Sequence, residues 1–364
     1  MFKTMRQCLI LCLPVLLAAV STAESAQPCV PLNGSQVIVW HAGSLSAAFK
    51  TIETDFTCQT GIAVSDNSAG SLDIVRQVTA GGKAADIVAP ADYLDIDLFL
   101  KPAGYAHWDI RFAEGKMVLA YCLGAGPVCG GASKQSASIA GAGTWGPPNS
   151  PTSDSIPNAV STWYQLLTTS GVTIGGSYLY LDPSGYRAPM IFHLAQNFYQ
   201  VANLYDNLLE HYFAIPATSA SSANKLGAQY DYSLTYQHSA YANSLSDPNY
   251  RYVNLPDNIN LGNSALNCSY QQAGIAQPGL FGNGFVSLPA SRVIWGVTML
   301  TNAPNPNNAV AFLNFLLGPD GEGALTAAGP APISPPVVTL RDYPNLPNSL
   351  KSRVHIDSGF EECL

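Results

Sequence analysis

The stretch VIVWHAGSLSAAFKTIETDF, residues 37–56, joins an apolar run, a glycine–serine turn and an amphipathic segment. Residues 37–40 are typical of a buried strand. Apolar residues then recur at the spacing of one helix face, namely Leu45, Phe49, Ile52 and Phe56. The turn between strand and helix contains Gly43 and Ser44. A helix that opens on such a turn presents unpaired backbone N–H groups, a hydroxyl and the positive end of its dipole, which together favour an anion.

The same pattern follows immediately downstream. Residues 61–64 predict a second strand, the turn Ala69-Gly70-Ser71-Leu72 comes next, and residues 72–78 show helical spacing. Residues 85–88 then predict a third buried strand. This alternation is typical of an α/β fold with mostly parallel sheets. Ligands of such sheets bind at the carboxyl ends of the strands, where Ser44 and Ser71 both stand.

A third turn, residues 182–187 (DPSGYR), follows an expected strand near residues 178–181 and precedes a helical pattern. Three turns of this kind indicate a site that is enclosed from two sides. Taken singly, each has an ordinary structural interpretation, because serine is a favoured N-cap in any helix and aspartate before proline is a common turn former.

Composition narrows the class of partner. The chain has 364 residues, of which 11% are charged, and its net charge is −8. Nucleic acid is therefore not an expected partner, since phosphate backbones select faces rich in lysine and arginine. A small anion remains possible, because a few local N–H dipoles can outweigh a modest global charge. The length suffices for two lobes.

The first residues predict an export signal. Basic residues precede an apolar run at 9–20, and small residues at 21–23 follow it, so residues 1–23 are expected to be removed as a signal peptide. The apolar run is too short to span a bilayer. We therefore expect a soluble mature chain that is periplasmic or secreted.

Six of the eight cysteines remain after such a cleavage, an even number in an oxidising compartment. Six cysteines allow 15 pairings. Sequence proximity, and the need to secure the C-terminal tail, favour Cys29–Cys58, Cys122–Cys129 and Cys268–Cys363. A protein metal site is not expected, since the chain contains no CxxC, HxH or HExxH spacing.

Several motifs resemble, in their order and spacing, the tungstate/molybdate-binding proteins of ABC importers. Each motif is weak alone, whereas the succession is specific. The resemblance covers nearly all of the expected mature chain except residues 124–158, residues 214–229 and the C-terminal tail. Its motifs lie at residues 39–46, 69–71, 85–93, 105–108, 117–121, 182–187, 255–262 and 296–300.

The resemblance implies a type II-like periplasmic-binding-protein fold, in which two α/β lobes joined by a strand hinge close on one tetrahedral oxyanion in a central cleft. The first lobe would comprise residues 24–112 and 301–364, and the second residues 113–300. The implied anion ligands are Ser44 and Ser71 from the first lobe, and Asp182, Ser184 and Tyr236 from the second, with Gly43, Gly70 and Gly185 as secondary candidates. Arg187 is expected to brace the turn at Tyr186 within its own lobe.

One position departs from the family pattern. Some members complete the coordination of the metal with a glutamate upstream of the ligand tyrosine, and the matching position here is Thr218, within a stretch at residues 212–230 that contains no acidic residue. Asp182 alone could then make the bound metal five-coordinate, or turn aside and leave it tetrahedral. A lone aspartate could also accept a proton from hydrogen phosphate.

These observations predict an extracytoplasmic solute-binding protein, monomeric and without catalytic activity or cofactor. It would deliver tungstate or molybdate to the membrane permease and ATPase of an ABC importer. The alternative is a phosphate- or sulfate-binding receptor or sensor of the same fold. A secreted hydrolase is less favoured, because the chain lacks GxSxG and offers the serine turns no histidine suited to a triad except the strand residue His41.

Overall fold

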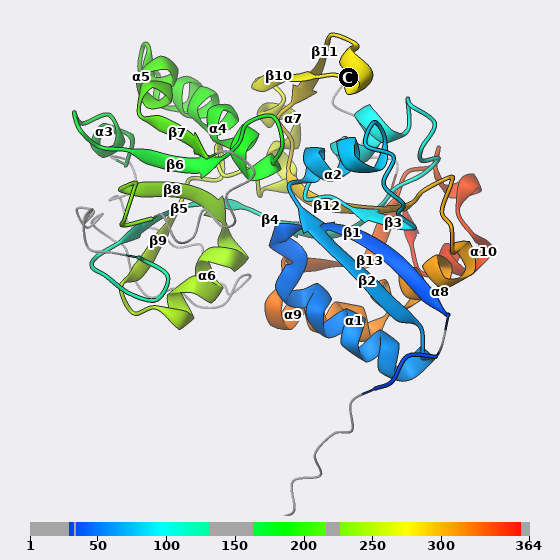
Figure 1. Ribbon diagram of the computed structural model, residues 1–364. Coiled ribbons are helices and arrows are strands. Elements are labelled where there is room, and N and C mark those ends of the chain that lie inside the picture. Colours follow the sequence, from blue (N-terminus) through cyan, green and yellow to red (C-terminus); the bar gives the residue numbers. More distant parts are fainter. Residues whose placement is uncertain (1–28, 33, 131–162, 216–225, 358–364) are drawn as a thin grey trace, which may run out of the picture.

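The computed structural model describes residues 29–32, 34–130, 163–215 and 226–357. Two lobes, each built around its own β-sheet, lie side by side (Figure 1). In this part of the chain no helix has both the length and the apolar character needed to cross a membrane. The expected signal peptide at 1–23 lies outside the described residues.

The first lobe contains a seven-stranded sheet in the order β14-β13-β4-β12-β3-β1-β2. Its strands are β1 (Gln36–Ala42), β2 (Ala63–Ala69), β3 (Ile87–Ala89), β4 (Ile110–Gly115), β12 (Val293–Met299), β13 (Ala331–Val338) and β14 (His355–Ile356). The helices packed on it are α1 (Ser46–Thr60), α2 (Ser71–Val78), α8 (Pro306–Leu316), α9 (Pro319–Ala328) and α10 (Asn348–Lys351).

The amphipathic pattern of α1 is confirmed. Its predicted face, Leu45, Phe49, Ile52 and Phe56, is fully buried. Phe56 packs edge-on against Phe312 and Phe315 of α8. Burial of a large apolar side chain stabilises a fold by about 1.5–3 kcal/mol, so this face fixes α1 and α8 on the sheet that carries Ser44.

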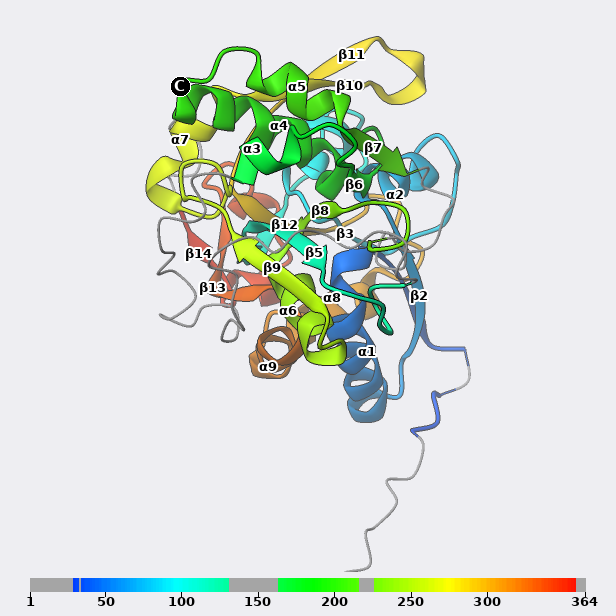
Figure 2. The ribbon, with the colours of Figure 1, turned by 90° about the vertical axis from the view of Figure 1, so that its left-hand side faces the viewer.

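The second lobe is built on a five-stranded sheet in the order β7-β6-β8-β5-β9. Helices α4 and α5 lie on one side of it and α6 on the other (Figure 2). A two-stranded ribbon and α7 complete this half of the chain. The elements are β5 (Met117–Cys122), α3 (Trp163–Leu167), β6 (Ile174–Ser177), α4 (Pro183–Tyr199), α5 (Leu204–Glu210), β7 (Tyr212–Ile215), β8 (Tyr232–Tyr236), α6 (Gln237–Ser246), β9 (Tyr250–Asn254), α7 (Asn267–Tyr270), β10 (Gly274–Pro278) and β11 (Phe285–Pro289).

The lobes are joined by extended segments that run next to each other. β4 continues through Lys116 into β5, and Met117 N donates to Asn260 O at 2.8 Å. The chain returns in β12, which pairs antiparallel with β4. The expectation of mostly parallel sheets is thus corrected. Neighbouring strands that carry the chain out of a lobe and back into it must run in opposite directions. β12 also pairs antiparallel with β3, β13 with β4, and β5 with β8 and β9.

Two further details differ from the sequence-based expectation. β12 belongs to the seven-stranded sheet, although the second lobe was expected to extend to residue 300. The strand expected near residues 178–181 lies at Ile174–Ser177 instead. Gly175 and Gly176 lower the β-propensity of that strand. Both positions require glycine, since a Cβ would lie 2.2 Å from the Tyr230 ring or 2.0 Å from the Tyr212 hydroxyl.

Two of the predicted disulfides, Cys29–Cys58 and Cys122–Cys129, are present. Cys268 is also disulfide-bonded. Its predicted partner Cys363 lies outside the described residues, so that pairing stays a prediction.

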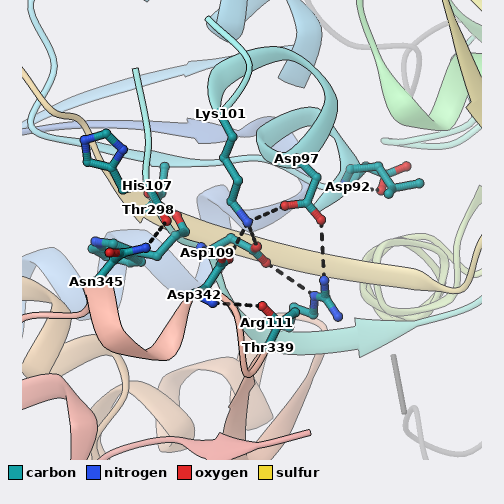
Figure 3. A network of polar contacts seen from close by, with 12 residues as sticks. Asp92, Asp97, Lys101, His107, Asp109, Arg111, Thr298, Thr339, Asp342 and Asn345 are labelled. Atoms are coloured by element: carbon teal, nitrogen blue, oxygen red, sulfur yellow. Dashed lines mark hydrogen bonds and ion pairs between the residues drawn. The ribbon is translucent and has the colours of Figure 1, made fainter. Parts of the chain in front are cut away.

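A buried ion network attaches the segment after β13 to the first lobe (Figure 3). Lys101 contacts Asp97 at 2.5 Å, Asp109 at 2.6 Å and also Asp342. Arg111 contacts Asp97 and Asp109 from the other side. Burial and the charge of Asp109 raise the pKa of Asp97 to about 7. Arg111 and Lys101 outweigh burial at Asp109 and lower its pKa to about 2. One lysine therefore holds three carboxyls together.

Replacing Lys101 by methionine should destabilise the protein by about 3–5 kcal/mol, because Asp342 loses its lysine partner and Asp97 and Asp109 are left with Arg111. The remaining carboxyls would then have folded-state pKa values above their unfolded ones, so stability falls as pH rises through that range. Urea unfolding should show a larger deficit at pH 8 than at pH 5. Lys50→Met, an exposed position on α1, is the control. Equal stabilities of the two variants would contradict this role.

Candidate functional site

Ser44 lies in a single helical turn, Gly43–Leu45, between β1 and α1. Its Oγ accepts a hydrogen bond from the indole Nε1 of Trp295 at 2.9 Å, and its carbonyl oxygen accepts from His238 Nε2 at 3.0 Å. The indole is a donor only, so the Ser44 hydroxyl must act as acceptor here. Its own hydrogen is left for another acceptor.

Ser71 is arranged in the same way. It is the first residue of α2, it is fully buried, and its Oγ accepts from the backbone N–H of Ala91 at 2.8 Å. Both predicted serines are thus held by an N–H donor of the first lobe. Each hydroxyl can donate one hydrogen bond to a bound group, and a negatively charged acceptor would gain most from it.

The third turn contacts the start of α2 from the second lobe. Leu72 N and Asp73 N donate to Leu181 O at 3.1 and 3.3 Å. Part of the helix terminus that the sequence analysis assigned to an anion is therefore occupied by a carbonyl group. Gly70 makes this approach possible, since a Cβ there would lie 2.4 Å from Leu181 O.

Asp182 is the N-cap of α4. Its Oδ1 accepts from Ser184 N at 2.8 Å and from Ser184 Oγ at 2.7 Å. The hydroxyl of Ser184 has a single hydrogen and donates it to the carboxylate, so Ser184 supports Asp182 in this arrangement. Burial raises the pKa of Asp182. Both of these contacts with Ser184 are made by Oδ1.

Arg187 crosses between the lobes. Its Nη1 donates to Tyr236 OH at 2.7 Å and to Ala91 O at 3.0 Å, and its Nη2 lies 3.1 Å from Asp92 Oδ2. The expectation that Arg187 braces only its own lobe is wrong, because two of these partners belong to the first lobe. Tyr236 OH accepts from the guanidinium, so it also has a hydrogen left to donate. Burial raises the pKa of Tyr236, which keeps the phenol protonated.

Two buried carboxyls that the sequence analysis missed complete this contact. Tyr186 OH donates to Asp92 Oδ2 at 2.8 Å and lies 3.4 Å from Asp95 Oδ1. Burial raises the pKa of Asp92, and burial together with the charge of Asp92 raises that of Asp95 well above its usual value. Their signal in the sequence is their place just after β3, at the same edge of the sheet as Ser44 and Ser71.

His238 and Trp295 were also missed as site residues. The His238 ring lies 5.4 Å from the Trp295 ring and 5.8 Å from the Tyr236 ring. Burial lowers the pKa of His238 to about 4. The ring is therefore neutral near pH 7, and its proton is on Nε2, because a carbonyl oxygen can only accept.

The contacts form one path around the junction of the lobes. It runs from Ser44 to Trp295, whose ring lies 5.0 Å from the Tyr236 ring. From Tyr236 it continues through Arg187 and Ala91 to Ser71. Gly70 and Leu181 then connect Ser71 to Asp182 and Ser184. The structure thus brings together all the predicted ligand residues that it describes, whereas Thr218 lies outside the described residues.

A family model described as bacterial extracellular solute-binding protein matches residues 37–330. The chain belongs to this family. An uncharacterised solute-binding protein of Petrotoga mobilis is 30% identical, over 83% of this chain and 85% of the relative. A protein of Thermococcus kodakarensis named molybdate/tungstate-binding protein WtpA is 28% identical, over 95% of both chains.

Solved structures support the two-lobed fold of this solute-binding protein. The sulfate-binding protein SubI of Mycobacterium tuberculosis superimposes with a TM-score of 0.56 and 16% identity, over 83% of this chain and 88% of its own. The periplasmic molybdate-binding protein of Azotobacter vinelandii gives a TM-score of 0.51 and 16% identity, over 81% and 98%. At these identities the likeness establishes the fold alone.

Gly70→Ala should separate the lobes without damaging either one. The backbone of Gly70 (φ −65°, ψ 143°) accepts alanine, yet the new Cβ would collide with Leu181 O of the other lobe. Gly43→Ala is the matched control, because its Cβ would come no closer than 3.8 Å to Ser68 Oγ. Small-angle X-ray scattering should give a larger radius of gyration for Gly70→Ala than for Gly43→Ala. The same radius for both would show that the contact does not hold the lobes.

Proposed function

We propose that this protein captures a tetrahedral oxyanion, tungstate or molybdate, between its lobes outside the cytoplasm and presents it to the permease of an ABC importer, without catalysis. The observation that carries the proposal is that the hydroxyls of Ser44 and Ser71 make the same kind of hydrogen bond. Each buried or half-buried hydroxyl accepts an N–H and keeps its own hydrogen for a ligand.

The hydroxyl donors suit an anion that has no proton of its own. Tungstate and molybdate are unprotonated at neutral pH, so they can only accept hydrogen bonds. Ser44 and Ser71 supply donors from the first lobe and Tyr236 from the second. Ligand contacts made from both lobes would stabilise the arrangement in which the lobes touch. The name of the Thermococcus kodakarensis relative supports the choice of ion.

Asp182 opposes simple anion binding. A carboxylate about 4 Å from a unit negative charge is repelled by roughly 4 kcal/mol at an effective dielectric near 20. The repulsion is offset if a carboxylate oxygen bonds the metal of the oxyanion, because hard oxygen ligands suit such a centre. Oδ2 is the oxygen that would form this bond, since Oδ1 holds the Ser184 turn.

Phosphate or sulfate is the second candidate. The raised pKa of Asp182 supports phosphate, because such a carboxyl can share the proton of hydrogen phosphate, whereas sulfate has no proton to share at neutral pH. A sensor that binds the same ion would use the same contacts.

A hydrolase is disfavoured by the position of His238. Its Nε2–H donates to the carbonyl oxygen of Ser44 and so does not act as a base toward the Ser44 hydroxyl. Nucleophilic catalysis requires a base within reach of the nucleophile.

Calorimetric titration with tungstate, molybdate, sulfate and phosphate tests the proposal. Ser44→Ala and Ser71→Ala should each weaken binding of the preferred ion roughly tenfold to a hundredfold, since a hydrogen bond to a charged group contributes about 1.5–3 kcal/mol. Ser46→Ala, an exposed neighbour whose hydroxyl bonds Ser68, should bind like the wild type. If both site variants retain wild-type affinity at intact melting temperature, the site is misplaced.

Asp182→Asn distinguishes the ways in which Asp182 could act. Asparagine keeps an oxygen for the N-cap, so stability should change little. If the carboxylate bonds the metal, the variant should lose tungstate affinity at least tenfold. If the carboxylate only repels the anion, affinity should rise. Tighter binding by Asp182→Asn would therefore contradict coordination by this residue.

A further inference from the structure

The side chains of a histidine and two acidic residues lie close together in the first lobe. They are not among the residues that form the contacts between the lobes. His41 lies on β1, Glu53 on α1 and Asp66 on β2. One ligand atom from each lies within 4.8 Å of the other two. The three elements are fixed by the core beneath them, since the His41 ring packs 4.7 Å from the ring of Phe49.

The orientation of His41 is set by its backbone contact. The side chain is fully buried, and Nδ1 lies 2.8 Å from the carbonyl oxygen of Ala42. A carbonyl only accepts, so Nδ1 carries the hydrogen. In the neutral ring Nε2 is then an acceptor. Metal-ligating histidines are commonly held in this way, with one nitrogen donating to a carbonyl and the other facing the ion.

Nε2 faces another acceptor. It lies 2.8 Å from Asp66 Oδ1 but forms no hydrogen bond, so the pair is close without being aligned as donor and acceptor. Glu53 Oε1 is also buried without a partner. Within the described residues, no lysine or arginine forms an ion pair with either carboxylate.

We propose that His41 Nε2, Glu53 and Asp66 bind a divalent transition-metal ion of the zinc type. Imidazole and carboxylate are ligands that zinc accepts. Two ligand atoms about 2.1 Å from a tetrahedral ion lie roughly 3.4 Å apart, each directed at the ion and not at the other. Nε2 and Oδ1 are 2.8 Å apart here, so the two side chains would move apart by about 0.6 Å around the ion. The side chain of Asp66 is 47% exposed, so the ion can enter from solvent and water can complete its coordination.

The proposal does not depend on the anion site. A bound ion would join β1, β2 and α1 just before the turn that carries Ser44, and it would stabilise the first lobe whether or not an oxyanion is present. The competing account is an imidazolium ring that pairs with the Asp66 carboxylate and needs no metal.

The test is a calorimetric titration of the untagged, disulfide-intact, EDTA-treated mature protein with zinc chloride. The wild type should bind one equivalent. Asp66→Asn and Glu53→Gln remove one ligand with little change of shape, and each should weaken zinc binding at least tenfold. Asp55→Asn is the control, because this exposed carboxylate lies on the same helix outside the cluster.

Cobalt provides a second readout. Cobalt chloride should give visible absorption bands of a low-symmetry site with the wild type and Asp55→Asn, and these bands should be lost in Asp66→Asn. A wild type that does not saturate with zinc, or three variants that all bind it with equal affinity, would overturn the proposal and favour the imidazolium pair.

Discussion

The buried guanidinium of Arg187 is the group on which the arrangement of the two lobes depends. A cation removed from water must be surrounded by acceptors, and its acceptors come from both lobes: Tyr236 OH, Ala91 O and Asp92. Ala91 in turn donates its N–H to Ser71. The Arg187 side chain therefore positions one hydroxyl of each lobe, Tyr236 OH and Ser71 Oγ. If the lobes separated, the guanidinium would lose protein acceptors and would have to be hydrated instead.

The loop that carries Asp92 and Asp95, the carboxyls at this contact, is itself held in place by the ion network of Lys101. Asp92 and Asp95 precede the turn at Ile96–Leu100 that carries Asp97, and Lys101 fixes Asp97 to Asp109 and Asp342. The ion network thus anchors the loop against which Tyr186 and Arg187 dock. A chain with few charged residues concentrates several of them in these two places, one structural and one at the junction of the lobes.

Features encoded locally could be predicted from the sequence. The face of α1, the two glycine–serine turns and two disulfides follow from periodicity, turn chemistry and short separations along the chain. The strand at Ile174–Ser177 was misplaced because its glycines are needed for the close approach of Tyr230 and Tyr212, which are distant in sequence. Trp295, His238 and Asp92 come from separate elements. Their contacts with Ser44 and Arg187 exist only after folding, as does the convergence of His41, Glu53 and Asp66, which follows no short metal-binding spacing.

The central claim is that an oxyanion binds between the lobes at hydroxyls that already accept an N–H. A crystal structure grown with tungstate, with anomalous data collected at a tungsten absorption edge, tests it most directly. The account predicts one strong peak within hydrogen-bonding reach, through its oxygens, of Ser44 Oγ, Ser71 Oγ and Tyr236 OH. A peak elsewhere on the protein, or none at this junction at saturating tungstate, would contradict it.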